Sequence, residues 1–182
     1  MKQIKKSLLP IFLITMLISC KKDKTGSEAA DQLPPSTQIG ANTFGCLVNG
    51  TVWIPKGFSG TGTPNPHIIY STGLNGLPYL MIETKQIIEN SVEGTIILYF
   101  FNLDHIGNFD YSADFNFSFG WSKYFGQCGV LPSDTSLNKS GVGTVTKLDL
   151  QNRIISGTFN CMFKITQCET ISLSNGRFDI KF

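Results

Sequence analysis

Two histidines, His67 and His105, are the side chains of this 182-residue chain best suited to proton transfer near neutral pH. A serine or cysteine nucleophile needs such a histidine as its base, held in turn by a third group. His67 begins an expected strand and His105 lies in an expected loop, so neither has this setting. We therefore expect no catalytic residue, and we do not expect an enzyme.

Three glutamates, Glu83, Glu89 and Glu93, are the remaining side chains that could act in acid–base chemistry. Two of them as a carboxylate pair could hydrolyse a glycosidic bond, provided that their separation fits the reaction. Because the sequence does not encode that separation, we expect solvated surface positions. A carboxylate-pair hydrolase is thus the least favoured of the functional hypotheses.

Oxygen donors suited to calcium gather between Asn102 and Asp114. The candidate ligands are Asp104, Asp110 and Asp114. Their spacing is not that of an EF-hand loop, and turns use Asp and Asn in any case. We therefore expect neither a metal site nor a cofactor.

Four cysteines, Cys46, Cys128, Cys161 and Cys168, could form disulfides in an exported protein. None of them has the C-x-x-C spacing of a zinc site. Matching core positions with core positions pairs Cys46 with Cys161, and matching loops pairs Cys128 with Cys168. The alternative is that one or two remain buried free thiols, which behave as small apolar residues.

Aromatic side chains could bind a sugar ring or a peptide by stacking, because their faces are flat and apolar and their edges polar. They are also frequent in strands for packing reasons alone. The candidates for stacking are Trp53, Tyr70, Tyr79, Trp121 and Tyr124.

The first nineteen residues have the pattern of an export signal, in which Lys2, Lys5 and Lys6 precede an uncharged run from Ser7 to Ile18. This run is shorter than the roughly 20 residues that span a bilayer. Its end, Leu17-Ile18-Ser19-Cys20, resembles the bacterial lipobox. The resemblance implies that the thiol of Cys20 receives a diacylglycerol, that cleavage falls before Cys20, and that the new amino group is acylated, with palmitate expected. Several acyl chains make a lasting membrane anchor.

The mature chain carries little net charge. Removal of three lysines with the signal lowers the 15 basic residues to 12, against 13 acidic ones, and the formal charge from +2 to −1. A net charge so close to zero does not indicate a basic surface that would bind nucleic acid.

The mature chain divides into a tether and one domain. Residues 20–43 are rich in Lys, Ser, Asp, Pro and Thr, which predicts a flexible tether after the lipidated cysteine. Residues 44–182 have the length of one domain.

The sequence of the domain shows the residue patterns of β-strands. In "DFNFSFGW", Phe115, Phe117, Phe119 and Trp121 alternate with small or polar residues, and "RIISGTFNCMFKI" and "GRFDIKF" alternate likewise. "TIILYFF" has no such alternation and is expected to be covered on both faces or to lie near the middle of the fold. Asn49-Gly50 and Asn175-Gly176 are expected at hairpin turns. These signals predict an all-β fold, an antiparallel β-sandwich of about nine or ten short strands, with a closed β-barrel as the alternative.

Both ends of the domain resemble uncharacterised lipoproteins of Bacteroidota. "TFGCLVNGTVW" fits an opening motif T-F-G-C-x-V-N-G-x-x-W, and "SGTF" and "GRFD" fit the closing motifs. The resemblance implies a small all-β secreted lipoprotein, and it implies no catalytic residue. The motifs themselves predict a hairpin at each end of the domain, with Trp53 and Phe178 as core anchors.

Three functions compete on this basis. The first is a non-catalytic envelope lipoprotein that binds a glycan, a peptide or a partner protein. The second is a structural or assembly component of the outer membrane, and the third is the hydrolase. "CKKDK" lacks a run of acidic residues after Cys20, so we expect the periplasmic face of the outer membrane rather than the cell surface.

Overall fold

The protein is almost entirely built of antiparallel strands. A computed structural model describes residues 26–57, 63–73, 76–89, 91–111, 114–121, 138–164 and 170–182, except for the side chains of residues 26, 27 and 121. In these ranges the elements are α1 (Gly26–Ala30), β1 (Thr43–Val48), β2 (Thr51–Trp53), β3 (His67–Thr72), β4 (Pro78–Ile88), β5 (Ser91–Phe100), β6 (Gly107–Asp110), β7 (Phe115–Trp121), β8 (Asn138–Asp149), β9 (Ile154–Lys164) and β10 (Ile171–Lys181).

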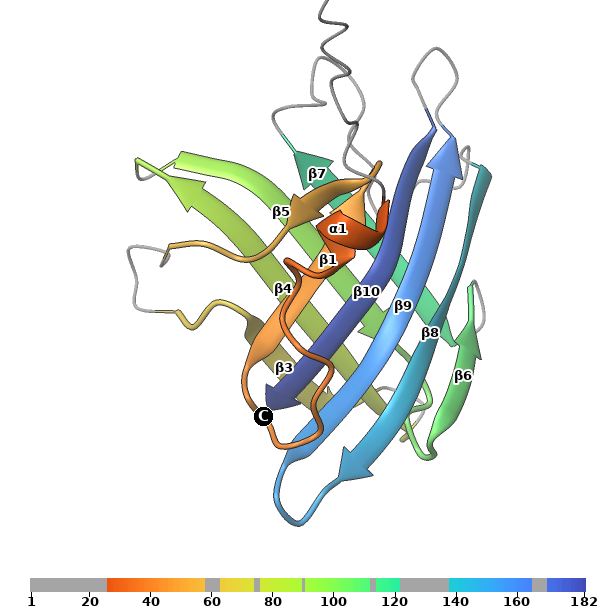
Figure 1. Cartoon of the computed structure of the whole chain (residues 1–182). Coiled ribbons are helices and arrows are strands. Elements are labelled where there is room, and N and C mark those ends of the chain that lie inside the picture. Colours follow the sequence, from red (N-terminus) through yellow and green to blue (C-terminus); the bar gives the residue numbers. More distant parts are fainter. Residues whose placement is uncertain are drawn as a thin grey trace, which may run out of the picture.

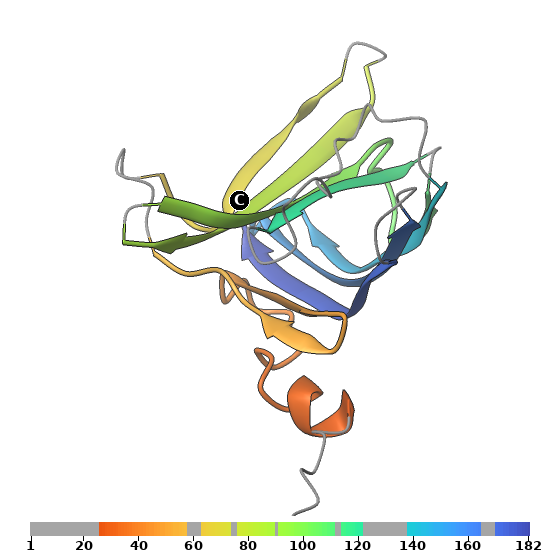
Figure 2. The same ribbon diagram turned by 90° about the horizontal axis from the view of Figure 1, so that it is seen from above.

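The strands form two sheets that face each other, as Figures 1 and 2 show. The six-stranded sheet has the order β2-β1-β10-β9-β8-β6, and the four-stranded sheet has the order β3-β4-β5-β7. Neither sheet closes into a barrel, so the predicted antiparallel β-sandwich is confirmed. Several strands are longer than expected, because β4, β5, β8, β9 and β10 have 10 to 12 residues each.

The core is a layer of phenylalanines between the sheets. On β7, Phe115, Phe117 and Phe119 all point inward and are at most 2% exposed. On β9, Phe159 is buried and its ring lies 5.3 Å from that of Phe44. The period-two pattern therefore identified the buried face correctly on these strands.

One strand departs from the prediction. Ile96, Leu98 and Phe100 of β5 are fully buried, but Ile97 and Tyr99 between them are only half-buried. The expectation that "TIILYFF" is covered on both faces was wrong, since one face alone meets the core. The alternative, a place near the middle of the fold, is confirmed, because β5 lies between β4 and β7 in its sheet. The other face carries apolar side chains on the outside of the four-stranded sheet.

The two Asn-Gly pairs differ in structure. Asn49 and Gly50 have φ angles of 46° and 77°, and they join β1 to β2 in the expected hairpin turn. Asn175-Gly176 lies inside β10, so the second hairpin prediction was wrong. The register of β10 against β9 shifts between Leu173 and Gly176, and Asn175 has a φ of 51°, which together describe a β-bulge.

The predicted tether is partly folded, which corrects the boundary at residue 43. Residues 26–42, here called the N-terminal strap, run over the outside of the six-stranded sheet before β1 begins (Figure 1). Ala29 and Leu33 are buried against Leu47, so the few apolar residues of this segment suffice to dock it. In the described ranges, no helix is long and apolar enough to cross a membrane.

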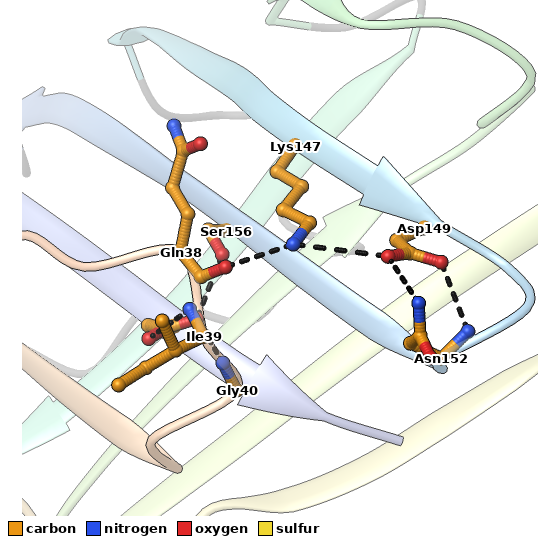
Figure 3. A network of polar contacts seen from close by, with 8 residues as sticks. Gln38, Ile39, Gly40, Lys147, Asp149, Asn152 and Ser156 are labelled. Atoms are coloured by element: carbon orange, nitrogen blue, oxygen red, sulfur yellow. Dashed lines mark hydrogen bonds and ion pairs between the residues drawn. The ribbon is translucent and has the colours of Figure 1, made fainter.

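The strap is also held by polar contacts to β8 and β10. Figure 3 shows its backbone at Gln38, Ile39 and Gly40 beside Ser156, with the ammonium of Lys147 donating to the Gln38 carbonyl at 2.9 Å. The central acceptor is the carboxylate of Asp179, which is 1% exposed. Composition alone could not reveal this acceptor, because it lies about 140 residues away in sequence.

Candidate functional site

The outer face of the four-stranded sheet presents an ordered array of side chains. Along β4, buried Leu80, Ile82 and Thr84 alternate with half-buried residues on the opposite face. The register of β3, β4 and β5 arranges these outer residues in rows across the sheet. The rows are Lys85 with Thr95, then His67 with Glu83 and Ile97, then Ile69 with Met81 and Tyr99, and finally Ser71 with Tyr79.

One end of this face is charged. Glu83 lies directly opposite His67 across the β3–β4 ladder, and its Oε2 is 3.5 Å from His67 Nδ1. Its other oxygen, Oε1, lies 3.0 Å from the ammonium of Lys85. All three side chains remain between 21% and 36% exposed, so they can still bind a ligand.

The other end is apolar and aromatic. Met81 lies opposite Tyr99, and the rings of Tyr99 and Phe101 are nearly parallel, with centroids 6.2 Å apart. Burial, together with the charge of Glu83, raises the pKa of the Tyr99 phenol, which therefore stays a hydrogen-bond donor. Ile69 and Phe101 are 36% and 38% exposed, and no residue of this apolar end belongs to the two buried clusters of the described chain.

The edge of the face is fixed by Asn65. Its side-chain amide donates to the carbonyl of Lys85 at 2.8 Å and to that of Lys56 at 3.1 Å, and its Oδ1 accepts from the Lys85 amide at 2.9 Å. These bonds hold residues 63–66 against β4 and so position His67. Beside them lies a groove of about 330 Å³, lined by Pro64, Pro66, His67, Ile68 and Phe182 among others.

Both histidines are paired with carboxylates in the part of the chain that the structure describes, His67 with Glu83 and His105 with Asp104. The face that holds His67 offers ring surfaces, one carboxylate and several hydrogen-bond donors.

The structure distributes the predicted stacking aromatics over different environments. Trp53 is fully buried, so its prediction as a stacking residue was wrong and its prediction as a core anchor is confirmed. Its Nε1 has no hydrogen-bond partner among the described residues. Tyr70 packs beside the core, with its ring 4.7 Å from that of Phe182. Tyr79 does lie on the outer face. The side chain of Trp121 and all of Tyr124 lie outside the described residues.

The carboxylates proposed from sequence are likewise separated. Glu89 is exposed at the turn after β4, with a φ of 49°, whereas Glu83 lies in the middle of that strand. Of the calcium candidates, Asp104 is bonded to His105 at 2.6 Å and Asp114 accepts from Asn102 at 2.7 Å. Across the described ranges, no three such residues, Asp110 included, form a group that could hold a metal ion.

Cys46 and Cys161 are both buried free thiols, so their predicted pairing was wrong. Cys46 lies on β1 and Cys161 on β9, and β10 runs between them. Strands are 4.7 to 4.9 Å apart, so two strands separate these residues by about 10 Å, beyond the roughly 7 Å that a disulfide bridges. Cys20, Cys128 and Cys168 lie outside the described residues, so their predicted roles stay predictions.

Sequence reasoning missed most of this face. Met81, Ile97, Tyr99 and Phe101 were not among the predicted binding residues, because their strands were read as core. The residue types of β4 and β5 give no signal that could have found them, because apolar residues follow one another in both strands. The period of two appears only in the burial of these strands, which places Met81, Ile97 and Tyr99 on one face together with Glu83. No protein-family model, curated protein or solved structure matches this chain at a significant level.

Proposed function

We propose that this protein is a non-catalytic envelope lipoprotein, and that the outer face of its four-stranded sheet binds a neutral glycan. The observation that carries the proposal is the composition of this face. A solvated sheet face is normally polar, yet Ile69, Met81, Ile97 and Tyr99 are neighbours in its two middle rows. The same rows also hold the polar residues His67, Glu83, Asn116 and Ser118. The outer face of the six-stranded sheet fits that rule much better, because Ser140, Thr144, Thr158 and Ser172 lie along it.

A neutral ligand is favoured by the charges of the face. Glu83 and Lys85 neutralise each other at 3.0 Å, so no excess charge attracts a phosphate, an acidic chain or a basic peptide. Both groups still offer hydrogen bonds, as does the phenol of Tyr99. Ring faces combined with neutral donor and acceptor groups suit a polyhydroxylated sugar.

The size of the face supports a glycan over a folded partner protein. The four rows on β3, β4 and β5 span about 15 Å by 20 Å, or roughly 300 Å². A standard protein–protein interface buries about 800 Å² on each partner. The face is thus less than half of what a stable protein complex uses, and it is wide enough for several sugar rings.

The lipid anchor is supported by the sequence pattern around Cys20. A basic start, a short apolar run and a small residue before the cysteine are the features that direct lipid attachment. On this proposal the protein is held at the outer membrane, preferably on its periplasmic side, where it would meet envelope glycans.

Calorimetric titration of the lipidated chain in detergent with neutral oligosaccharides of glucose, mannose, xylose and N-acetylglucosamine tests the proposal, with heparin and alginate as charged comparisons. We expect at least one neutral glycan to bind. Met81→Ala and Tyr99→Ala should each weaken that binding about tenfold or more, which corresponds to about 1.4 kcal/mol.

The matched control is Met162→Ala. Met162 is 49% exposed on the outer face of the six-stranded sheet, so it tests the loss of an exposed methionine elsewhere. Equal affinities for the Met81→Ala and Met162→Ala proteins would show that the proposed face is wrong. Binding of heparin or alginate alone, or of a protein partner alone, would contradict the neutral glycan.

A further inference from the structure

The N-terminal strap limits how far the proposed lipid anchor can lie from the docked part of the chain. Residues 26–42 are docked along the six-stranded sheet, so the chain is held on the domain from Gly26 onward and not only from Thr43. Five residues lie between Cys20 and Gly26, so the Cα atoms of these two residues are at most about 20 Å apart. Without the docked strap, the limit from Cys20 to Thr43 would be about 80 Å.

The strap is docked along its whole length. Near α1, Ala29 and Leu33 pack on Leu47, and the guanidinium of Arg177 donates to the Pro34 carbonyl at 3.2 Å. The strap packs so closely on Gly45 of β1 that a Cβ at this position would lie 2.9 Å from Pro34. The apolar half of the strap therefore leaves no room for a larger residue beneath it.

The second half of the strap converges on Asp179. Its carboxylate accepts from the Thr37 hydroxyl at 2.5 Å and from the amides of Ile39, Gly40 and Ala41 at 2.8 to 3.1 Å. Ser156 donates to the same carboxylate at 2.7 Å, which joins the strap to β9. Hydrogen bonds to an ionised, buried acceptor are about twice as strong as neutral ones.

The strap also sets the direction of the anchor. Figure 2 shows α1 on the outside of the six-stranded sheet, with the four-stranded sheet on the opposite side of the sandwich. A helix layer and a second sheet each add about 10 Å, so α1 and the four-stranded sheet are separated by roughly 20 Å. The side of the domain that carries α1 is thus the side from which the chain leaves toward Cys20.

We infer that the domain stands on the lipid surface with the α1 side of its six-stranded sheet toward the membrane, and with the outer face of the four-stranded sheet held away from it. This inference rests on the proposed lipid anchor at Cys20. The docked strap leaves only five residues between Cys20 and Gly26, and so limits the distance between the anchor and the domain. A glycan-binding face so held points into the aqueous space and not into the lipid headgroups.

Energy transfer to the membrane tests the inference. The lipidated chain is reconstituted in phosphatidylethanolamine and phosphatidylglycerol vesicles that carry an acceptor dye on the headgroups. A donor dye is attached through an unnatural amino acid at Asp31, which follows α1, or at Ser71 on β3, both of which are exposed. We expect transfer from position 31 to exceed that from position 71 at least about twofold, given the 20 Å separation.

Two further variants separate the strap from the rest of the fold. A twelve-residue Gly/Ser insertion after Thr25 leaves the strap intact and lengthens the free chain, so transfer should fall at both positions. Thr37→Val removes one donor to Asp179 with little change in shape, and Asp179→Asn removes the ionised acceptor. Both should reduce the difference between the two positions, with circular dichroism as the check that the sheets remain folded.

The outcomes distinguish the anchor from the orientation. A chain that fails to float with the vesicles would contradict the lipid anchor itself. A chain that floats but gives equal transfer from positions 31 and 71 would overturn the proposed orientation alone. Unchanged transfer after the Gly/Ser insertion would also overturn it, because the length of the segment between Cys20 and Gly26 would then not set the distance to the membrane.

Discussion

The hydroxyl of Thr37 donates a hydrogen bond of 2.5 Å to the carboxylate of Asp179, which follows it by 142 residues. Burial by itself raises the pKa of Asp179. The bonds from Thr37 and Ser156 and from the amides of Ala41 and Gly40 outweigh this effect and lower the pKa from 3.8 to about 2. The carboxylate is therefore ionised in the folded state at every physiological pH.

This lowered pKa predicts acid-dependent stability. Because the folded pKa lies below the unfolded one, the contribution of Asp179 is fully present above about pH 4 and is lost as the pH falls toward 2. At about 1.4 kcal/mol per pKa unit, the difference amounts to about 2 kcal/mol. Denaturant titrations at pH 7, 4 and 2 should show that the gap in unfolding free energy between the wild type and Asp179→Asn narrows by this amount.

Asp110→Asn is the matched control for that series, since Asp110 is exposed at the end of β6. Its unfolding free energy should follow that of the wild type throughout. A gap between wild type and Asp179→Asn that stays constant from pH 7 to pH 2 would show that the carboxylate is not held in its charged form.

The phenylalanine face of β9 should dominate the stability of the sandwich. Phe159 is 1% exposed and stacks on Phe44, so Phe159→Ala should cost about 3 to 5 kcal/mol of unfolding free energy by leaving a cavity. The neighbouring Thr158 lies on the outer face, opposite Thr144, and Thr158→Ala should cost far less. Equal losses in guanidinium titrations would mean that the two faces of β9 are inverted.

Much of the fold could be predicted, because apolar and polar residues alternate along a strand that buries one face. Phe115, Phe117 and Phe119 alternate in this way and are buried, and strands of this kind predicted the sandwich. Asn175-Gly176 did not mark a turn, because the residues on both sides pair with β9 and β1 and continue the same strand. An Asn with positive φ serves a turn and a bulge equally well, so only the long-range pairing decides between them.

The candidate site was harder to predict for a related reason. Tyr99 looked like core because it stands in an apolar run, although its side chain points to the other face of the sheet from Leu98 and Phe100. Conversely, Trp53 looked like a platform although it is fully buried. Residue type cannot separate these cases, since aromatic residues suit both a core and a binding face.

Lipid attachment at Cys20 is expected to be the only acylation of the chain. Cells grown with an alkyne analogue of palmitate should produce a labelled protein, and Cys20→Ala should abolish the label because both the diacylglycerol site and the new amino terminus are lost. Cys161→Ala is the matched control, since the thiol of Cys161 is buried and should play no part. Label that persists in the Cys20→Ala protein would contradict the anchor.

The remaining thiols should divide into two classes. Burial raises the pKa of Cys46, and burial together with the nearby Cys46 raises the pKa of Cys161, so neither forms the reactive thiolate. Iodoacetamide should therefore leave both unmodified in the native protein and alkylate both in guanidinium.

Cys128 and Cys168 are predicted to form a disulfide that closes a loop of about 40 residues and adds about 3 to 4 kcal/mol to the unfolding free energy in the chain-entropy model. Mass mapping of a proteolytic digest should then find one linked peptide pair, Cys128 with Cys168, and two alkylated peptides. A linked peptide that joins Cys46 to Cys161 would contradict the strand order, because β10 would have to leave its place between them.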